Sequence, residues 1–532
     1  MIVTRLAWAV TCAATTASCG WLAGLGSYGV SSDGRTGDAV DAPAGAPPQP
    51  TARFPWNGYD TGSPSGDGQQ PRFSWPAGDV RETYEIELSP SCDVATMQTC
   101  TFGDTMPVPL GSVTSYVVPM PLAISKVAPV GARWFWRLAA CNGSDCSWSD
   151  VRYLDVGRLA NDHLGVGTSQ IAVGSETGEV FVFRSAATVD AISTAAYGAH
   201  FGLAASIGDF DGDGFGDLAV YADGSGSDGV LVLEYGGPSR AATTIENATV
   251  MAGEQFGLAS MSPGDLDGDG YDDLVVVTAT VVSEFRGGSG GLSMPPSAQY
   301  NAEGTSTTFG LGFSGVGDVD GDGFPDFAVA TDGGALVLFY GPLESGRMMS
   351  VAAPNATTAW GQAITGGDIN GDGFSDVIAS GVDSSTGGVV YAFYGGADGL
   401  QASPVQLFGN VTHGDAFGQA LVYEPEGSGF AIAVGDDTRA TLFYGAGQTE
   451  SLLAPAGPIT PMYGSVLGGG DMAGSGFSNI VVGSPGDMFE TNACGEAYAF
   501  SVDPTGLVSA PSLALTPSDC VTGEQFGVAV SR

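Results

Sequence analysis

The chain has 532 residues, 84 of them glycine, and a formal net charge of −42 with a single lysine, Lys126. Such a charge repels nucleic-acid phosphates and anionic membrane surfaces, so neither is an expected partner. The length exceeds that of one ordinary domain, and abundant glycine and aromatic residues with few charges favour an all-β protein of many short strands and turns.

Residues 1–19 are predicted to be an export signal. Arg5 precedes an apolar stretch from Leu6 to Ala17, and small residues lead to Cys19. The end of this segment resembles a bacterial lipoprotein cleavage box, in which the cysteine is lipidated, although Thr16 stands where leucine is usual. Two locations therefore stay open: the cell surface, with Cys19 as a lipid anchor in an outer membrane, or secretion. Such an anchor is the only membrane association expected.

Residues 20–50 are dense in proline, glycine and alanine without periodicity, which predicts a disordered linker. Residues 51–157 contain alternating apolar and polar stretches separated by turns, over the length of a small β-sandwich. The placement of Trp75, Trp134 and Trp136 resembles that in a fibronectin type III domain, which implies such a sandwich. These tryptophans fit either a carbohydrate platform or the sandwich core, and the core interpretation is favoured.

Six cysteines follow the leader, and an even number in an exported protein predicts disulfides. Their spacing favours the local pairs Cys92–Cys100, Cys141–Cys146 and Cys494–Cys520. Zinc is the alternative, but there is no Cys-x-x-Cys and the three histidines are scattered, at His163, His200 and His413.

Residues 158–532 repeat with a period of about fifty residues, which is typical of a propeller or an array. Each repeat holds an aromatic-glycine pair, an apolar strand and an aromatic-rich strand, and each of these elements occurs seven times. The aromatic-glycine pairs, expected to lie in the first strand of each repeat, begin at Phe201, Phe256, Phe309, Trp360, Phe417, Tyr463 and Phe526.

The phase of the repeats predicts how the array ends. The first repeat begins with its second and third strands, near residues 171 and 180, whereas an aromatic-glycine strand ends the chain at 526–530. Donating the last strand to the incomplete first repeat would close a ring and hide a strand edge. The sequence therefore predicts a seven-bladed β-propeller whose C-terminal strand closes the split first blade.

Four consecutive repeats contain a nine-residue loop of the form Asp-x-Asp/Asn-Gly-Asp-Gly-aromatic-x-Asp. Calcium prefers six to eight oxygen ligands, which carboxylates at positions 1, 3, 5 and 9 and the carbonyl at position 7 can supply. One such loop could be a simple turn, but four in phase predict about four structural calcium ions. The candidate ligands are Asp209, Asp211, Asp213, Phe215 and Asp217; Asp265, Asp267, Asp269, Tyr271 and Asp273; Asp318, Asp320, Asp322, Phe324 and Asp326; and Asp368, Asn370, Asp372, Phe374 and Asp376.

The corresponding segments 162–170, 427–430 and 471–479 retain loop glycines without the full ligand set, and no calcium is expected there. The Phe-Gly pair, the acidic loop and the following apolar strand together resemble the FG-GAP repeats of integrin α-chain propellers and of many bacterial surface proteins. The resemblance implies a seven-bladed propeller with calcium loops on one face and a different surface that binds protein or glycan. Only the metal ligands can be transferred to this chain.

The favoured function is an extracellular binding or adhesion module for an unknown protein or carbohydrate ligand, and not an enzyme. A secreted polysaccharide-active enzyme and a passive surface spacer are the alternatives. Residues 287–291 fit a Gly-x-Ser-x-Gly hydrolase elbow, but that element needs a strand-to-helix turn and a partnered histidine. His200 lacks a partner motif and is interpreted as an ordinary residue at a strand end.

Overall fold

The computed structural model describes residues 47–530 with gaps, the longest at 62–68, 93–99, 159–170, 194–200, 223–228, 246–255, 302–307, 410–416, 454–461, 471–478, 486–494, 502–510 and 516–528. The predicted export signal, Cys19, the Cys494–Cys520 pair and the degenerate loop at 162–170 lie outside the described residues. The described regular elements are strands, with one short 3-10 turn at Leu343–Ser345. The all-β prediction is therefore confirmed.

Residues 51–157 form two sheets around one core, and we call this part the sandwich domain. A six-stranded sheet runs in the order β1 (Tyr59–Asp60), β8 (Arg152–Val156), β6 (Ala132–Asn142), β3 (Thr83–Ser89) and β4 (Val108–Gly111), with β7 (Asp145–Trp148) beside β6. A second sheet pairs β2 (Arg72–Ser74) with β5 (Ser115–Val117). The closer likeness to a fibronectin type III domain stays a prediction.

The tryptophans of the sandwich domain belong to its core. Trp75, Trp134 and Trp136 are buried together with Phe73 and Ile86. This burial favours the core interpretation over a carbohydrate platform, because a platform needs exposed rings. Disulfides join Cys92 to Cys100 and Cys141 to Cys146, as their spacing predicts.

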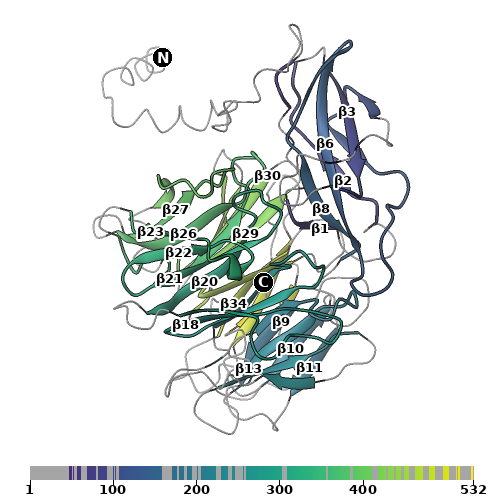
Figure 1. Cartoon of the computed structure of the whole chain (residues 1–532). Helices are drawn as coiled ribbons and strands as arrows, with labels where there is room; N and C mark the ends of the chain where they lie inside the picture. The colour runs from purple at the N-terminus through teal and green to yellow at the C-terminus, as the bar shows by residue number, and fades with distance from the viewer. Residues whose placement is uncertain are drawn as a thin grey trace, which may run out of the picture. The chain divides into compact units, whose positions relative to one another are not determined.

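The described part of residues 158–532 forms seven sheets, which we number I to VII in chain order (Figure 1). Sheet I runs β11 (Thr188–Ser193), β10 (Glu179–Arg184), β9 (Ile171–Ser175) and β37 (Ala529–Val530). Sheets II and III are β12 (Ala205–Gly208), β13 (Asp217–Ala222), β14 (Val230–Glu234), β15 (Ala242–Ile245), and β16 (Ala259–Gly264), β17 (Asp273–Val277), β18 (Val281–Phe285), β19 (Ala298–Asn301). The other sheets repeat this antiparallel order.

Sheet IV is β20 (Phe309–Gly317), β21 (Asp326–Thr331), β22 (Ala335–Phe339) and β23 (Met348–Ala352). Sheet V holds β24 (Thr357–Thr358), β25 (Ile364–Gly367), β26 (Asp376–Asp383), β27 (Gly387–Phe393) and β28 (Val405–Gly409). Sheet VI is β29 (Ala420–Glu426), β30 (Gly429–Gly435), β31 (Ala440–Tyr444) and β32 (Thr449–Leu453). Sheet VII is β33 (Val466–Gly470), β34 (Asn479–Ser484), β35 (Glu496–Ser501) and β36 (Leu513–Leu515).

The second strand of each repeat is apolar on both faces because it packs against two neighbouring sheets. Successive side chains of a strand point to opposite faces. In β13, Leu218 and Val220 pack in the core shared with sheet I, whereas Ala219 packs in the core shared with sheet III. The short runs of consecutive apolar residues in the sequence follow from this two-sided burial.

Each sheet shares a core with the next, and sheet VII shares one with sheet I. In that last core Val173 and Phe181 of sheet I meet Val481 and Leu515 of sheet VII, with Val530 of β37 among them. The C-terminal strand β37 pairs antiparallel with β9, where the repeat phase placed it. The β-propeller prediction is confirmed, whereas the number of blades and the closure of the ring stay a prediction.

The aromatic-glycine pairs do not all lie within the first strand, contrary to expectation. Phe309 and Gly310 do belong to β20, but Trp360 and Phe417 precede β25 and β29. Gly361 and Gly418 have φ of +77° and +91°, a conformation that favours turns over strands. The aromatic rings nevertheless lie buried in the cores between sheets.

Candidate metal centres

Each acidic loop connects the first and second strands of one sheet, in sheets II to V. We call them loop 1 (residues 209–217), loop 2 (residues 265–273), loop 3 (residues 318–326) and loop 4 (residues 368–376). The last residue of each loop begins the second strand, as Asp217 begins β13. Every predicted metal ligand thus lies in a connection held at both ends by paired strands.

The ninth loop residue anchors the loop, since both of its carboxylate oxygens accept backbone N–H groups. Phe210 N–H donates to Asp217 Oδ2 and Gly236 N–H donates to Oδ1, each at 2.8 Å. The same two bonds recur at Asp273, Asp326 and Asp376. One donor is the loop's second residue and the other follows the third strand, so this carboxylate ties the loop to its sheet.

The first loop residue leaves an oxygen unpaired in loops 1 and 2. Its Oδ2 accepts the N–H of the sixth residue in every loop. The Oδ1 atoms of Asp209 and Asp265 are buried and have no hydrogen-bond partner. A buried carboxylate oxygen without a partner is costly, so these atoms fit the position of cation ligands.

In loops 3 and 4 the equivalent oxygen takes part in the loop's own hydrogen bonds. Asp318 Oδ1 accepts the N–H groups of Gly321 and Asp322, at 2.7 and 3.1 Å. Asp368 Oδ1 makes the same two bonds in loop 4. The four loops therefore share one sequence pattern but show two hydrogen-bond arrangements at their first residue.

Several carboxylates converge within single loops. Oxygen atoms of three residues lie within 4.8 Å of one another in each of loops 1 to 3, in the groups Asp209, Asp211 and Asp217; Asp265, Asp267 and Asp269; and Asp318, Asp320 and Asp326. In loop 4 the amide of Asn370 donates to Asp372 at 2.8 Å. The clustered oxygens could hold a metal ion, and hard oxygen donors suit calcium.

Burial and neighbouring carboxylates raise the pKa of several of these aspartates. Burial raises the pKa of Asp209 to about 8 and that of Asp217 to about 9, and neighbouring carboxylates add to both shifts. Burial likewise raises the pKa of Asp273 to about 9 and that of Asp318 to about 7. A divalent cation among these oxygens would favour their ionised forms.

Adjacent loops interlock through glycine and aromatic residues. A Cβ on Gly212, the fourth residue of loop 1, would lie 2.5 Å from the ring of Tyr271, the seventh residue of loop 2. The same contact recurs between Gly268 and Phe324 and between Gly321 and Phe374. Gly212 also has a φ of +69°, so backbone conformation and the neighbouring ring both require glycine there.

The rings of three predicted seventh-position residues thus pack on the preceding loop. Their N–H groups, and that of Phe215 in loop 1, donate to the fifth residue's carboxylate. The use of the seventh-residue carbonyl as a metal ligand stays a prediction.

Three residues that the sequence analysis did not single out connect neighbouring loops or sheets. The Asp272 carboxylate accepts the N–H of Asp209 at 2.8 Å, and its own N–H donates to the Asp209 carbonyl at 3.0 Å. Ser375 N–H donates to the Asp318 carbonyl at 2.8 Å. At loop 4, which is followed in sheet VI by a connection without the acidic pattern, the Tyr423 hydroxyl donates to the Asp368 carbonyl at 3.1 Å. Asp272 and Ser375 share the eighth loop position, which the ligand pattern ignores.

An arginine already contacts the carboxylates of loop 3. Arg347, half-exposed beside β23, forms ion pairs with Asp320 and, at 3.0 Å, with Asp322. Both partners are predicted metal ligands. The guanidinium therefore competes with a cation for the same oxygens.

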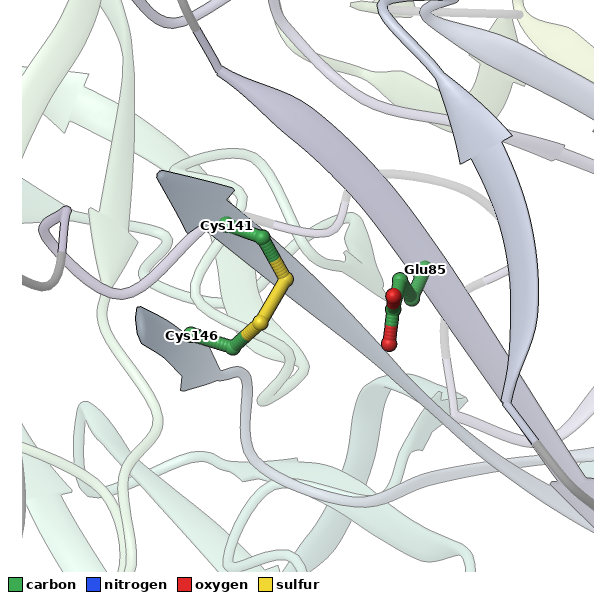
Figure 2. A group of neighbouring side chains, drawn as sticks. All are labelled: Glu85, Cys141 and Cys146. Atoms are coloured by element: carbon green, nitrogen blue, oxygen red, sulfur yellow. A yellow bond between two sulfur atoms is a disulfide. The ribbon is translucent and has the colours of Figure 1, made fainter. Parts of the chain in front are cut away.

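A different acidic and cysteine group does not fit a metal. Figure 2 shows Glu85 beside Cys141 and Cys146, whose sulfur atoms are joined in a disulfide. Disulfide sulfurs are not thiolates and therefore do not act as zinc ligands.

The glycine segment 287–291 forms a turn after β18. Gly287 N–H donates to Asp273 Oδ1, Gly288 N–H to the Phe210 carbonyl, and Gly291 N–H to the Gly288 carbonyl. The segment leads to no described helix, so it lacks the strand-to-helix turn of a hydrolase elbow. His200 lies outside the described residues.

Two stretches of the chain match known family models. Residues 318–379 match the FG-GAP-like repeat and residues 258–292 match the FG-GAP repeat. The chain therefore contains FG-GAP repeats. It is 30% identical over 246 residues to integrin alpha-PS2 of Drosophila melanogaster, across 40% of this chain and 17% of that relative. It is 32% identical over 163 residues to integrin alpha-V of Gallus gallus, across 27% of this chain and 16% of that relative.

This FG-GAP protein is thus integrin α-like over part of its length, and it spans less than a fifth of these relatives. A solved structure, BBS1N in complex with ARL6DN, aligns with a TM-score of 0.38 at 13% identity over 62% of this chain and 86% of that chain. The part of the FG-GAP protein that the structure describes contains no helix with the length and hydrophobicity of a membrane span.

Proposed function

We propose that this FG-GAP protein is an exported, calcium-binding β-propeller that acts as a binding or adhesion module for a protein or a glycan. The observation that carries the metal part is the pair of buried, unpaired oxygens on Asp209 and Asp265 inside repeated acidic loops. The similarity to integrin α-chains supports the binding role and an extracellular location. A seven-bladed ring closed by β37 is part of the same proposal.

Calcium fits these loops better than magnesium. Calcium accepts six to eight oxygens in flexible geometry, whereas magnesium demands an octahedron and keeps its water. Each loop offers three or four carboxylates, and the charge of the chain leaves them without enough basic partners. We therefore assign about four calcium ions, one to each loop.

The role of calcium in this proposal is structural. The ninth-residue carboxylate already fixes each loop to its sheet, and loops 1 to 4 interlock through their glycines and rings. An ion at the centre of such a loop would hold the first, third and fifth residues against that fixed frame. Recognition of a ligand would then fall to other inter-strand loops, whose geometry the ordered blades maintain.

A metal count on the purified chain tests the calcium assignment. The protein is stripped with chelator, dialysed against calcium and measured by mass spectrometry for bound metal, in parallel with Asp209→Ala and with the exposed-site control Asp398→Ala. We expect about four calcium ions for the wild type and the control, and one fewer for Asp209→Ala. A wild-type protein that retains no calcium would refute the assignment.

A separate experiment tests the binding role. The calcium-loaded chain is applied to protein and glycan arrays, with a chelated sample as the comparison. Binding to a defined ligand class that chelation weakens is the expected result. A chain that holds its calcium yet binds no protein or glycan would favour the passive spacer.

A further inference from the structure

The sandwich domain donates hydrogen bonds to three of the four acidic loops. The acceptors are backbone carbonyl oxygens of the fourth or sixth loop residue, and none of these is a predicted metal ligand. The bonds are Val130 N–H to Gly212, Arg133 Nη1 to Gly323, Arg152 Nη2 to Gly371 and Asn57 Nδ2 to Gly373, at 2.9, 2.6, 3.2 and 2.7 Å. All four acceptors are glycines.

The loop glycines also leave room for the sandwich domain. A Cβ on Gly373 would lie 3.0 Å from Arg152 Nε, and one on Gly214 would lie 3.1 Å from Val130. A Cβ on Gly270 of loop 2 would lie 2.7 Å from Pro129. Loop 2 is therefore in close contact with the same domain, so that all four loops meet it.

Opposite charges add to these contacts at the first residue of the loops. Arg152 Nη1 lies 3.7 Å from Asp368, and Arg158, in the connector after β8, lies 3.8 Å from Asp265. Tyr153 and Asp318 of loop 3 line one cavity, where burial and the nearby Asp318 carboxylate raise the pKa of the tyrosine. The sandwich domain and the connector after β8 thus approach the first residue of loops 2, 3 and 4 as well as their glycines.

Arg152 shows that these contacts are specific to the docked arrangement. Its side chain is only 6% exposed, and arginine is almost never buried without polar partners. The hydrogen bond and ion pair that the structure gives its guanidinium both lead to loop 4. If the sandwich domain were not docked on loop 4, the Arg152 guanidinium would lose both of these polar partners.

Contacts within the sandwich domain fix the orientation of the Arg133 side chain. Its Nε and Nη2 bind the two oxygens of Asp155 at 3.1 and 3.0 Å, and its guanidinium lies over the Tyr153 ring. Nη1 is then directed to Gly323. The donor is therefore pre-organised by the sandwich domain, which lowers the entropic cost of the contact.

The contacts also bring arginine side chains against the aspartates of the loops. Residues 51–158 hold half of the 16 basic residues of the chain, namely Arg53, Arg72, Arg81, Lys126, Arg133, Arg137, Arg152 and Arg158. The four loops carry aspartate at every predicted side-chain ligand position except that of Asn370. Three of these arginines contact the loops.

We propose that the glycine carbonyls of loops 1 to 4 form the docking surface of the sandwich domain, so that calcium in the loops and docking of the domain stabilise each other. The inference rests on the proposed calcium function. A loop wrapped around an ion holds its glycines in the positive-φ conformation that presents these carbonyls. Because linkage is reciprocal, docking must raise calcium affinity by the same factor by which calcium favours docking.

The test weakens the sandwich contacts without altering any loop: Arg152→Met removes a side-chain donor, and Val130→Asp places a carboxylate against acidic loop 1. The full chain is compared with Arg152→Met, with the double variant Val130→Asp plus Arg152→Met, and with the control Arg72→Met, whose arginine is exposed on β2. Small-angle X-ray scattering measures whether the domain stays docked, and calorimetric calcium titration measures affinity. Circular dichroism checks that each variant is folded. If the double variant does not fold, the comparison is made with Arg152→Met alone.

We expect compact wild-type and control proteins in calcium, and a larger maximum dimension for the wild type in chelator. The variants should be extended in calcium and should bind their weakest calcium about tenfold less tightly, within the usual range of coupling. Calcium binding with unchanged scattering and affinities in the folded variants would overturn the inference while leaving the proposed function intact. Failure of the wild type to bind any calcium would overturn both, and the metal count identifies that case.

Discussion

Sheets V and VI contain the same antiparallel strand order but join their first two strands differently. In sheet V the nine residues of loop 4 lead from β25 to β26, and Asp376 fixes the loop. In sheet VI β29 ends at Glu426 and β30 begins at Gly429, with these two residues paired. Within the segment 427–430, predicted as a degenerate loop, Gly429 and Phe430 thus belong to β30, and 427–428 lie outside the described residues.

This difference shows that a blade does not need an acidic loop to form its sheet. Ile432 and Val434 of β30 pack in the core with sheet V, as the second strands of other sheets do with their neighbours. The long loops therefore serve something other than strand pairing: they contact one another and the sandwich domain, and we propose that they bind calcium. The predictions that follow test whether these properties separate sheets II to V from sheet VI.

The largest expected effect is that of calcium removal. Each ion at about a hundredfold its dissociation constant would contribute about 2.7 kcal/mol, so chelation should lower the Tm by at least on the order of 10 °C. Hydrogen exchange measured below the Tm should accelerate in loops 1 to 4, while β30 and β31 of sheet VI retain their protection. Equal acceleration in both regions would remove the distinction between them.

Loss of an anchoring carboxylate should come next. Asp376→Ala removes the acceptor of two backbone N–H groups and a predicted calcium ligand, and should cost about 3 kcal/mol of unfolding free energy. Denaturant unfolding in calcium measures this cost. Asp398→Ala, at an exposed position between β27 and β28, is the matched control and should change stability by less than about 0.5 kcal/mol. Similar values for both variants would contradict the anchoring role.

A smaller effect is expected at the boundary between the two regions. Tyr423→Phe removes the hydroxyl that donates to the Asp368 carbonyl and should destabilise the protein by about 1 kcal/mol. Because that carbonyl belongs to the first residue of loop 4, calcium titration should show one weakened site. Tyr300→Phe on β19, whose hydroxyl has no hydrogen-bond partner among the described residues, is the control. An effect equal to that of the control would mean that sheet VI does not support loop 4.

The smallest effect concerns the competing arginine. Arg347→Met should raise the calcium affinity of loop 3 by up to about fivefold, because an exposed ion pair contributes at most about 1 kcal/mol. Calcium titration is the measurement, with Arg439→Met in sheet VI as the control. Unchanged or weaker calcium binding in Arg347→Met would show that the guanidinium does not compete with the ion.

The repeat pattern was sufficient to predict the all-β propeller and the position of the acidic loops. Both depend on short-range features, such as two-sided burial of Leu218 and Ala219 and the spacing of Asp209 to Asp217. The ends of the strands were less predictable. In the aromatic-glycine motif the ring of Trp360 is buried in the core, as in a strand, but the positive φ of Gly361 belongs to a turn.

The contacts of the loops with the rest of the protein were not predictable from the sequence. Asn57 and Gly373 are 316 residues apart, and no local pattern marks Asn57 as a partner. Tyr423 resembles any strand tyrosine until the fold brings its hydroxyl to loop 4. Such contacts depend on how sheets and domains meet, which a repeat pattern does not encode.

The interlocking of successive loops limits how this protein could be rebuilt. Because the glycine of one loop receives the ring of the next, the exchangeable unit is not one sheet with its own loop. A transplanted blade would need the aromatic residue of the next loop. The last acidic loop has no such neighbour in sheet VI and would need another contact, as the Tyr423 hydroxyl provides for loop 4. Duplication or shuffling would therefore preserve the array best when consecutive blades are moved together, so that each loop glycine keeps the ring of the following loop.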